Sequence, residues 1–88
     1  MKITSTPIGG VAVAEMEPVR DDRGTFARLF CTGELAGILG PRQIAQINRS
    51  HTNSVGAVRG FHYQRPPFAE MKLITCLNGR VWDVAVDL

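Results

Sequence analysis

The sequence predicts an all-β fold, either a sandwich or a barrel. Short segments in which apolar and polar residues alternate recur along the chain, as is typical of half-buried strands. The pair Asn78-Gly79 stands between two of these segments and is the residue pair most typical of a tight β-hairpin turn. Only one short segment has helical character, so many short strands dominate the predicted architecture.

In the N-terminal half, residues 11–14 follow Gly9-Gly10 and form a short predicted strand. Residues 21–24, Asp-Asp-Arg-Gly, have the composition of a turn, and residues 25–30 form a second predicted strand. Residues 33–39 are the helical segment, which Gly40-Pro41 should end.

In the C-terminal half, residues 43–49 form a third predicted strand and residues 50–54 a polar loop. Residues 55–64 form a fourth strand, which Pro66-Pro67 should end. Residues 71–77 and 80–88 form the last two strands, joined by the Asn78-Gly79 turn.

The predicted last hairpin assigns side chains to faces. A two-residue turn places Leu77 opposite Arg80, so that Lys72 and Asp83 share one face and lie diagonally, within reach of each other. A lysine and a carboxylate on a mostly apolar face are either a structural buried ion pair or residues of a functional site. The residues alone leave both interpretations open.

Two further strands carry polar side chains in informative positions. Gln46 and Asn48 share a face with Ile44, which suggests amides directed into a cavity or an ordinary solvent-facing polar stripe. Arg59 and His62 have opposite parity, so they converge on one site only if the strand bulges or twists between them. A glycine at position 60 would allow that bulge.

Composition limits the class of protein. With 44% hydrophobic and 20% charged residues, the 88-residue chain is globular rather than disordered, and it makes at most one small domain. No apolar run approaches the length of a membrane span and no signal-peptide core follows Met1, so we expect a cytoplasmic protein. A net charge of +2 is too small to indicate a nucleic-acid partner. Cys31 and Cys76 lack metal or redox spacing.

The last residues, Val86-Asp87-Leu88, fall within an alternating strand pattern. Because an unfinished strand edge must be covered, we expect residues 1–88 to be the N-terminal part of a longer protein, or else a subunit whose edge pairs with another chain.

The chain resembles the dTDP-4-dehydrorhamnose 3,5-epimerases and related nucleotide-sugar epimerases of the cupin class. The matching pieces, in the family's order, are Asp22-Arg23-Gly24-Thr25-Phe26, Gln46-Ile47-Asn48, Arg59-Gly60-Phe61-His62-Tyr63-Gln64, Pro66-Pro67, Lys72-Leu73 and Gly79-Arg80-Val81-Trp82-Asp83-Val84-Ala85-Val86-Asp87. Together these motifs are highly specific for the family.

The resemblance implies a cupin-like jelly roll (double-stranded β-helix), of which this chain holds only the N-terminal half. It also implies a homodimer and no metal or organic cofactor, while the unfinished strand edge makes a strand-exchanged oligomer the other expected assembly. The histidines agree with the expected lack of a metal, since His51 and His62 are too widely spaced in the sequence to form a typical cupin metal site.

The resemblance assigns roles to individual residues. His62 matches the base that removes a proton next to the 4-keto group of a dTDP-4-keto-6-deoxy sugar, and Lys72 matches the cation beside the keto oxygen. Asp83 is a candidate for the carboxylate that fixes the imidazole tautomer. The residues that match substrate-binding positions are Arg23, Phe26, Gln46, Asn48 and Arg59.

Three departures from the family pattern matter. Arg28 stands where the family often has an acidic residue, and the loop between Asn48 and Arg59 is about one residue longer than usual. The tyrosine that returns the proton in the family matches no residue of this chain, because Tyr63 lies beside His62 and is not its counterpart.

Three functions are therefore compatible with the sequence. The first is a nucleotide-sugar epimerase acting at C3 and/or C5, with the 88-residue chain inactive alone. The second is a truncated cupin that binds a nucleotide-sugar or dimerises without turnover, and the third is a non-functional truncation product.

Overall fold

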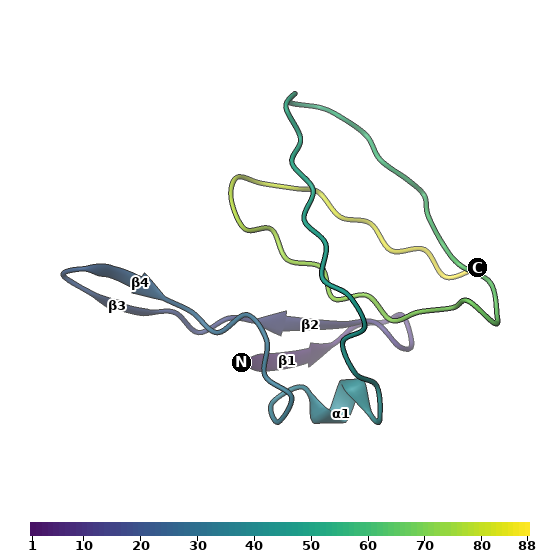
Figure 1. Ribbon diagram of the computed structural model, residues 1–88, viewed down its shortest axis with the longest axis horizontal. Coiled ribbons are helices and arrows are strands. Elements are labelled where there is room, and N and C mark those ends of the chain that lie inside the picture. Colours follow the sequence, from purple (N-terminus) through teal and green to yellow (C-terminus); the bar gives the residue numbers. More distant parts are fainter. The chain divides into compact units, whose positions relative to one another are not determined.

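The computed structural model describes residues 1–88, and its regular elements are short strands and a single short helix (Figure 1). The elements are β1 (Lys2–Ser5), β2 (Ala12–Glu15), β3 (Val19–Asp21), β4 (Gly24–Phe26) and α1 (Ala36–Leu39). They form two antiparallel two-stranded sheets, β1-β2 and β3-β4. No helix in the structure is long and apolar enough to cross a membrane.

The chain divides into two compact units. The first unit comprises Met1–Gln43 and Arg80–Leu88 and holds every strand and the helix. The second unit, Ile44–Gly79, contains bends and turns but no helix or strand. The single-domain organisation expected from the sequence stays a prediction.

The β1-β2 hairpin is closed by a loop that uses side-chain and backbone hydrogen bonds. The Thr6 hydroxyl donates to the carbonyl oxygen of Val11 at 2.8 Å, and the Val11 amide donates to the carbonyl of Ile8 at 3.1 Å. Gly10, at φ +81°, supplies the left-handed residue of this tight turn. Lys2 then pairs with Glu15. The strand predicted at residues 11–14 is confirmed with a one-residue shift, whereas β1 was not predicted.

The β3-β4 hairpin forms around the predicted Asp-Asp-Arg-Gly turn. Val19 pairs with Phe26, and Asp21 pairs with Gly24 at the loop. The Arg23 amide donates to the Asp21 carboxylate at 2.8 Å, the local bond by which aspartate stabilises a turn. The turn is thus confirmed, but the strand that follows it ends at Phe26 instead of continuing to residue 30.

The predicted helical segment is confirmed in a shorter form. A turn over residues 32–35 leads into α1, and the amide of Gly40, at φ +56°, donates to the carbonyl oxygen of Ala36 at 3.0 Å. Leu35, 2% exposed, is the only residue of the structure that is buried as a whole. The helix end at Gly40 follows the expected glycine stop.

The four C-terminal strand predictions are wrong for this structure. Residues 43–49, 55–64, 71–77 and 80–88 contain no strand, and only the two N-terminal ladders are present. Apolar side chains along these segments are exposed, among them Ile47 at 83% and Val58 at 92%. Strands of this kind need hydrogen-bonded neighbours and cover on their apolar faces, which these segments do not obtain here.

The hairpin predicted over residues 71–88 is also absent from the structure. The chain bends at Asn78-Gly79, where Gly79 has φ +82°, but no ladder joins the flanking segments. Trp82 is 93% exposed. Without a ladder there is no register to place Lys72 and Asp83 on one face, so that expectation is not realised.

Candidate functional site

The β3-β4 hairpin presents two of the predicted substrate-binding residues, Arg23 and Phe26. The Arg23 guanidinium donates to the Asp21 carboxylate, 2.6 Å from Nη2 and 3.2 Å from Nε, while its side chain stays 91% exposed. These hydrogen bonds hold the pKa of Asp21 below its ordinary value. Because a guanidinium has further N–H donors, Arg23 can be anchored by Asp21 and still meet an anion.

The same hairpin borders two open hollows. One, of about 270 Å³, is lined by Asp21, Arg23, Gly24, Thr25 and Phe26. The other, of about 210 Å³, is lined by Met1, Glu17, Val19, Phe26, Arg28 and Glu34. Phe26 borders both, which places its exposed ring between two sets of charged side chains.

Arg28, the residue that departs from the family pattern, is engaged by a carboxylate. Its Nη1 donates to the Glu34 carboxylate at 2.9 Å, and the Met1 ammonium donates to the other Glu34 oxygen at 2.6 Å. The Met1 ammonium and then Arg28 lower the pKa of Glu34 to about 2. Sequence reasoning missed Glu34, because a pairing across an irregular segment has no periodic signal.

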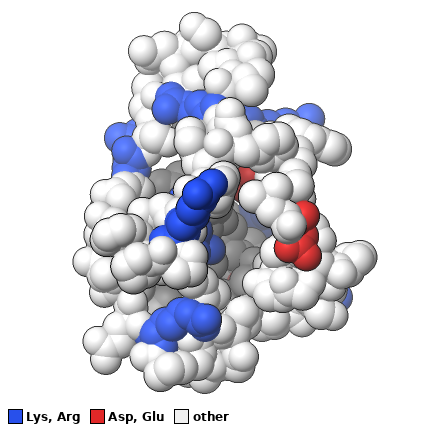
Figure 2. Space-filling view, turned by 90° about the vertical axis from the view of Figure 1, so that its right-hand side faces the viewer, with Lys and Arg blue, Asp and Glu red and all other residues white.

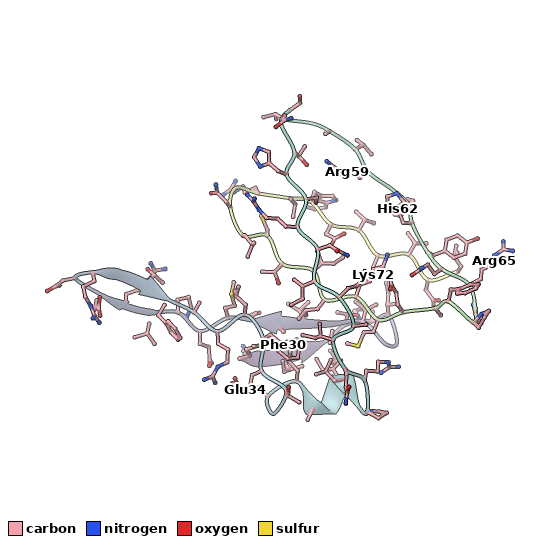
Figure 3. All side chains as sticks on the ribbon, viewed as in Figure 1. Phe30, Glu34, Arg59, His62, Arg65 and Lys72 are labelled. Atoms are coloured by element: carbon pink, nitrogen blue, oxygen red, sulfur yellow. The ribbon has the colours of Figure 1, made fainter.

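The second unit carries the majority of the predicted site residues. They are Gln46, Asn48, Arg59, His62 and Lys72, and all are exposed. Figure 3 labels Arg59 and His62 on one arm of this unit and Lys72 on the segment that follows. Figure 2 shows lysine and arginine side chains standing out from the surface of the face turned to the viewer. The side chains proposed for chemistry are thus open to solvent.

The backbone between Arg59 and His62 changes direction at Gly60, which has φ +112°. A Cβ atom at this position would lie 3.8 Å from the His62 Nδ1 atom, so the imidazole ring lies close to the glycine backbone. No ladder exists here, so the predicted bulge stays a prediction. Arg59 itself donates from Nη2 to the Thr52 hydroxyl at 3.2 Å.

Lys72 forms its ion pair with Glu70, at 3.8 Å between Nζ and Oε1. Its side chain is 46% exposed and that of Glu70 is 41% exposed, so this is a surface pair of small energetic value. Lys72 is therefore paired with Glu70 at the surface, and the expected buried ion pair with Asp83, one of the two interpretations, is not formed in this structure. The role of Asp83, also exposed, stays a prediction. No group of three or more metal-ligating side chains is clustered.

The chain thus combines two short β-hairpins with exposed cationic side chains, and comparison with known proteins identifies its family. The family model described as dTDP-4-dehydrorhamnose 3,5-epimerase matches residues 5–88. The chain belongs to this family. No solved structure matches it significantly.

Individual relatives agree with the family model. The chain is 39% identical to a dTDP-4-dehydrorhamnose 3,5-epimerase of Escherichia coli over 89 residues, covering 100% of the chain and 48% of the relative. It is also 39% identical to a dTDP-4-dehydrorhamnose 3,5-epimerase of Streptomyces griseus, and that match covers 92% of the chain and 40% of the relative. It is 38% identical to a dTDP-4-dehydrorhamnose 3-epimerase of Streptomyces niveus, and the match covers 93% of the chain and 41% of the relative. The chain thus spans less than half the length of these relatives.

Proposed function

We propose that this chain carries the proton-removing part of a nucleotide-sugar epimerase that acts at C3 and/or C5 of a dTDP-4-keto-6-deoxyhexose. The match to the epimerase family over residues 5–88 carries the proposal. Relatives named 3,5-epimerase and 3-epimerase are almost equally similar to the chain, so the number of carbons epimerised stays open.

In the proposed reaction the His62 imidazole accepts a proton from the carbon next to the 4-keto group. The C–H bond breaks, and its electron pair moves onto the keto oxygen to form an enolate. The Lys72 ammonium stabilises that negative charge, as cations do where charge develops in a transition state. Histidine suits the first step because it titrates near neutral pH. A carboxylate at Asp83 would fix the imidazole tautomer.

The remaining residues bind the substrate. Arg23 and Arg59 have the planar, multiply donating guanidinium that recognises a diphosphate. Gln46 and Asn48 supply amides for the sugar hydroxyls, and Phe26 supplies an apolar surface. The return of the proton to the opposite face is assigned to no residue of this chain.

The proposed architecture is the cupin-type jelly roll, with this chain as its N-terminal half. The proposed assembly is a homodimer or a strand-exchanged oligomer, and the chemistry as written needs no cofactor. The 88-residue chain alone should be inactive.

A binding or dimerisation module without turnover is the second candidate. Two observations favour it: every residue of the proposed chemistry is exposed, and Lys72 is paired with a neighbouring carboxylate. Such a module would bind the nucleotide and leave the sugar's protons in place.

Solvent deuterium uptake distinguishes these candidates. Residues 1–88 are joined to the part of the E. coli relative that they do not match, and deuterium at C3 and C5 is followed by mass spectrometry. We expect uptake in this chimera and none after His62→Ala, with His51→Ala as the matched control that retains it. Nucleotide binding without uptake by the chimera would favour the module. Uptake that persists in His62→Ala would reject the assigned base.

A further inference from the structure

We infer that Thr52 is a positioning residue for Arg59, and that it orients the Arg59 guanidinium toward the diphosphate of the nucleotide-sugar. This inference rests on the proposed function, because it takes Arg59 as a substrate-binding residue. The observation that carries it is the hydrogen bond from Arg59 Nη2 to the Thr52 hydroxyl oxygen at 3.2 Å.

The loop sequence explains why these two residues meet. A turn at residues 54–56 includes Gly56 at φ +82°, a conformation that residues with a Cβ atom rarely adopt. The turn lets the chain fold back, so that Thr52 on the incoming side reaches Arg59 seven positions later. Both residues belong to the second unit, within the loop drawn in teal to green in Figure 1.

The geometry leaves Arg59 able to bind an anion. The threonine hydroxyl accepts from one Nη2–H, and the remaining guanidinium N–H groups have no other partner in the structure. A long exposed arginine otherwise samples many rotamers, and holding it in one orientation before binding lowers the entropy that binding must offset. A hydroxyl is suited to this role, because it orients the guanidinium without neutralising its charge, as a carboxylate would.

The contrast with the other arginines is informative. Arg23 and Arg28 are held by carboxylates, at 2.6 Å from Asp21 and 2.9 Å from Glu34. Arg59 is instead held by a hydroxyl, so no carboxylate offsets its charge. It is therefore the better placed of the two predicted arginine contacts to attract a diphosphate.

The test measures thymidine diphosphate binding to the 88-residue chain by isothermal titration calorimetry. Thr52→Val removes the hydroxyl and keeps the shape, and we expect binding to weaken about three- to tenfold, the effect of one ordinary hydrogen bond. Thr52→Ser should restore affinity. Thr4→Val, on β1, is the matched control and should leave binding unchanged. Gly56→Ala should weaken binding as Thr52→Val does, because the strained turn no longer presents Thr52.

A double substitution and a ligand-free measurement make the outcome decisive. If Thr52 acts through Arg59, then Thr52→Val should have no further effect in an Arg59→Ala background. In the unliganded chain, Thr52→Val should sharpen and merge the Arg59 Nη resonances in nitrogen NMR as the side chain rotates faster.

Failure of the two proposals can be told apart. If Arg59→Ala weakens binding and Thr52→Val does not, the positioning role is overturned while the proposed function stands. If Arg59→Ala has no effect, or the unsubstituted chain does not bind thymidine diphosphate, the binding role of Arg59 falls and the role of Thr52 falls with it. Loss of binding in both Thr52→Val and Thr52→Ser would indicate a structural role and would also overturn the inference.

Discussion

The guanidinium of Arg28 and the carboxylate of Glu34 are joined at 2.9 Å between residues six positions apart. This ion pair ties the segment after β4 to the turn that leads into α1. The Met1 ammonium contacts the same carboxylate, so Glu34 carries two positive partners at once. A carboxylate held by two cations should stay ionised to unusually low pH.

The first prediction concerns the titration of Glu34. Its pKa is lowered from 4.5 to about 2 by the Met1 ammonium and by Arg28. Because the pKa is depressed in the folded chain, the stabilisation is complete above the ordinary pKa and is lost as the pH falls from about 4.5 toward 2. Carbon NMR of the Glu34 carboxylate should show this low midpoint.

Substitution of Arg28 tests whether its guanidinium is a partner of the Glu34 carboxylate. Arg28→Met should raise the Glu34 midpoint, and added salt should raise it too, since the pair is solvent-exposed. Arg20→Met is the matched control in the same unit, because Arg20 contacts Thr25 instead. An unchanged midpoint in Arg28→Met would contradict the pairing.

The second prediction concerns the turn of the β3-β4 hairpin. Asp21 accepts the Arg23 amide through one oxygen and the guanidinium through the other. Asp21→Ala removes both interactions, whereas Asp21→Asn keeps an acceptor for the amide. We therefore expect faster amide exchange in β4 for Asp21→Ala than for Asp21→Asn. Equal exchange rates in the two variants would mean that the amide contact does not stabilise the turn.

The third prediction compares two glycines of the helical segment. Gly40, at φ +56°, ends α1, so Gly40→Ala should destabilise the segment by about 1 kcal/mol. Gly37 lies inside the helix with open space where a Cβ would be, so Gly37→Ala should stabilise it by roughly 0.4–1 kcal/mol. Protection of the Ile38, Leu39 and Gly40 amides, which are hydrogen-bonded, measures both effects in hydrogen exchange. The same sign in both variants would be inconsistent with the helix end at Gly40.

The fourth prediction concerns Lys72 in the chimera with the E. coli relative. Lys72→Ala should slow deuterium uptake roughly 10²–10³-fold, because it removes the positive charge beside the forming enolate. Lys2→Ala removes an exposed lysine of β1 and should leave uptake unchanged. A Lys72→Ala rate close to that of the unsubstituted chimera would remove Lys72 from the reaction.

The fifth prediction is that the 88-residue chain associates. Large apolar side chains are exposed, including Val55, Val58 and Trp82, and exposed apolar surface favours contacts between chains. Sedimentation should detect a dimer or larger species at micromolar concentration. Fluorescence of the single tryptophan should shift to the blue as the concentration rises, since Trp82 is 93% exposed in the single chain. A stable monomer would refute this prediction.

Local signals predicted β2, the turn before β4 and the helical segment, but neither β1 nor β3. The turn at Asp21–Gly24 and the helix end at Gly40 both depend on residues within a few positions of each other, so the sequence shows them directly. Residues 55–64 and 71–77 have equally good strand patterns. Their pairing depends on distant neighbours and on covered apolar faces, which a local pattern cannot show.

The candidate site divides in a similar way. Residue types and motif order predicted Arg59, His62 and Lys72 as residues of the site, and their roles stay predictions. The partners of these side chains were less predictable, because the orientation of a long side chain follows from the loop that carries it. The contact of Arg59 with Thr52 depends on the turn at Gly56, whereas Glu70, two positions before Lys72, was a local signal that sequence reasoning overlooked.

The isolation of Leu35 as a fully buried apolar side chain determines how this chain should respond to heat and denaturant. The heat capacity of unfolding and the denaturant slope both scale with the surface newly exposed, and little apolar surface remains to be exposed here. Calorimetry of the single chain should therefore show a shallow, broad melting profile without a sharp heat-absorption peak. Each hairpin should lose its structure independently, at its own temperature.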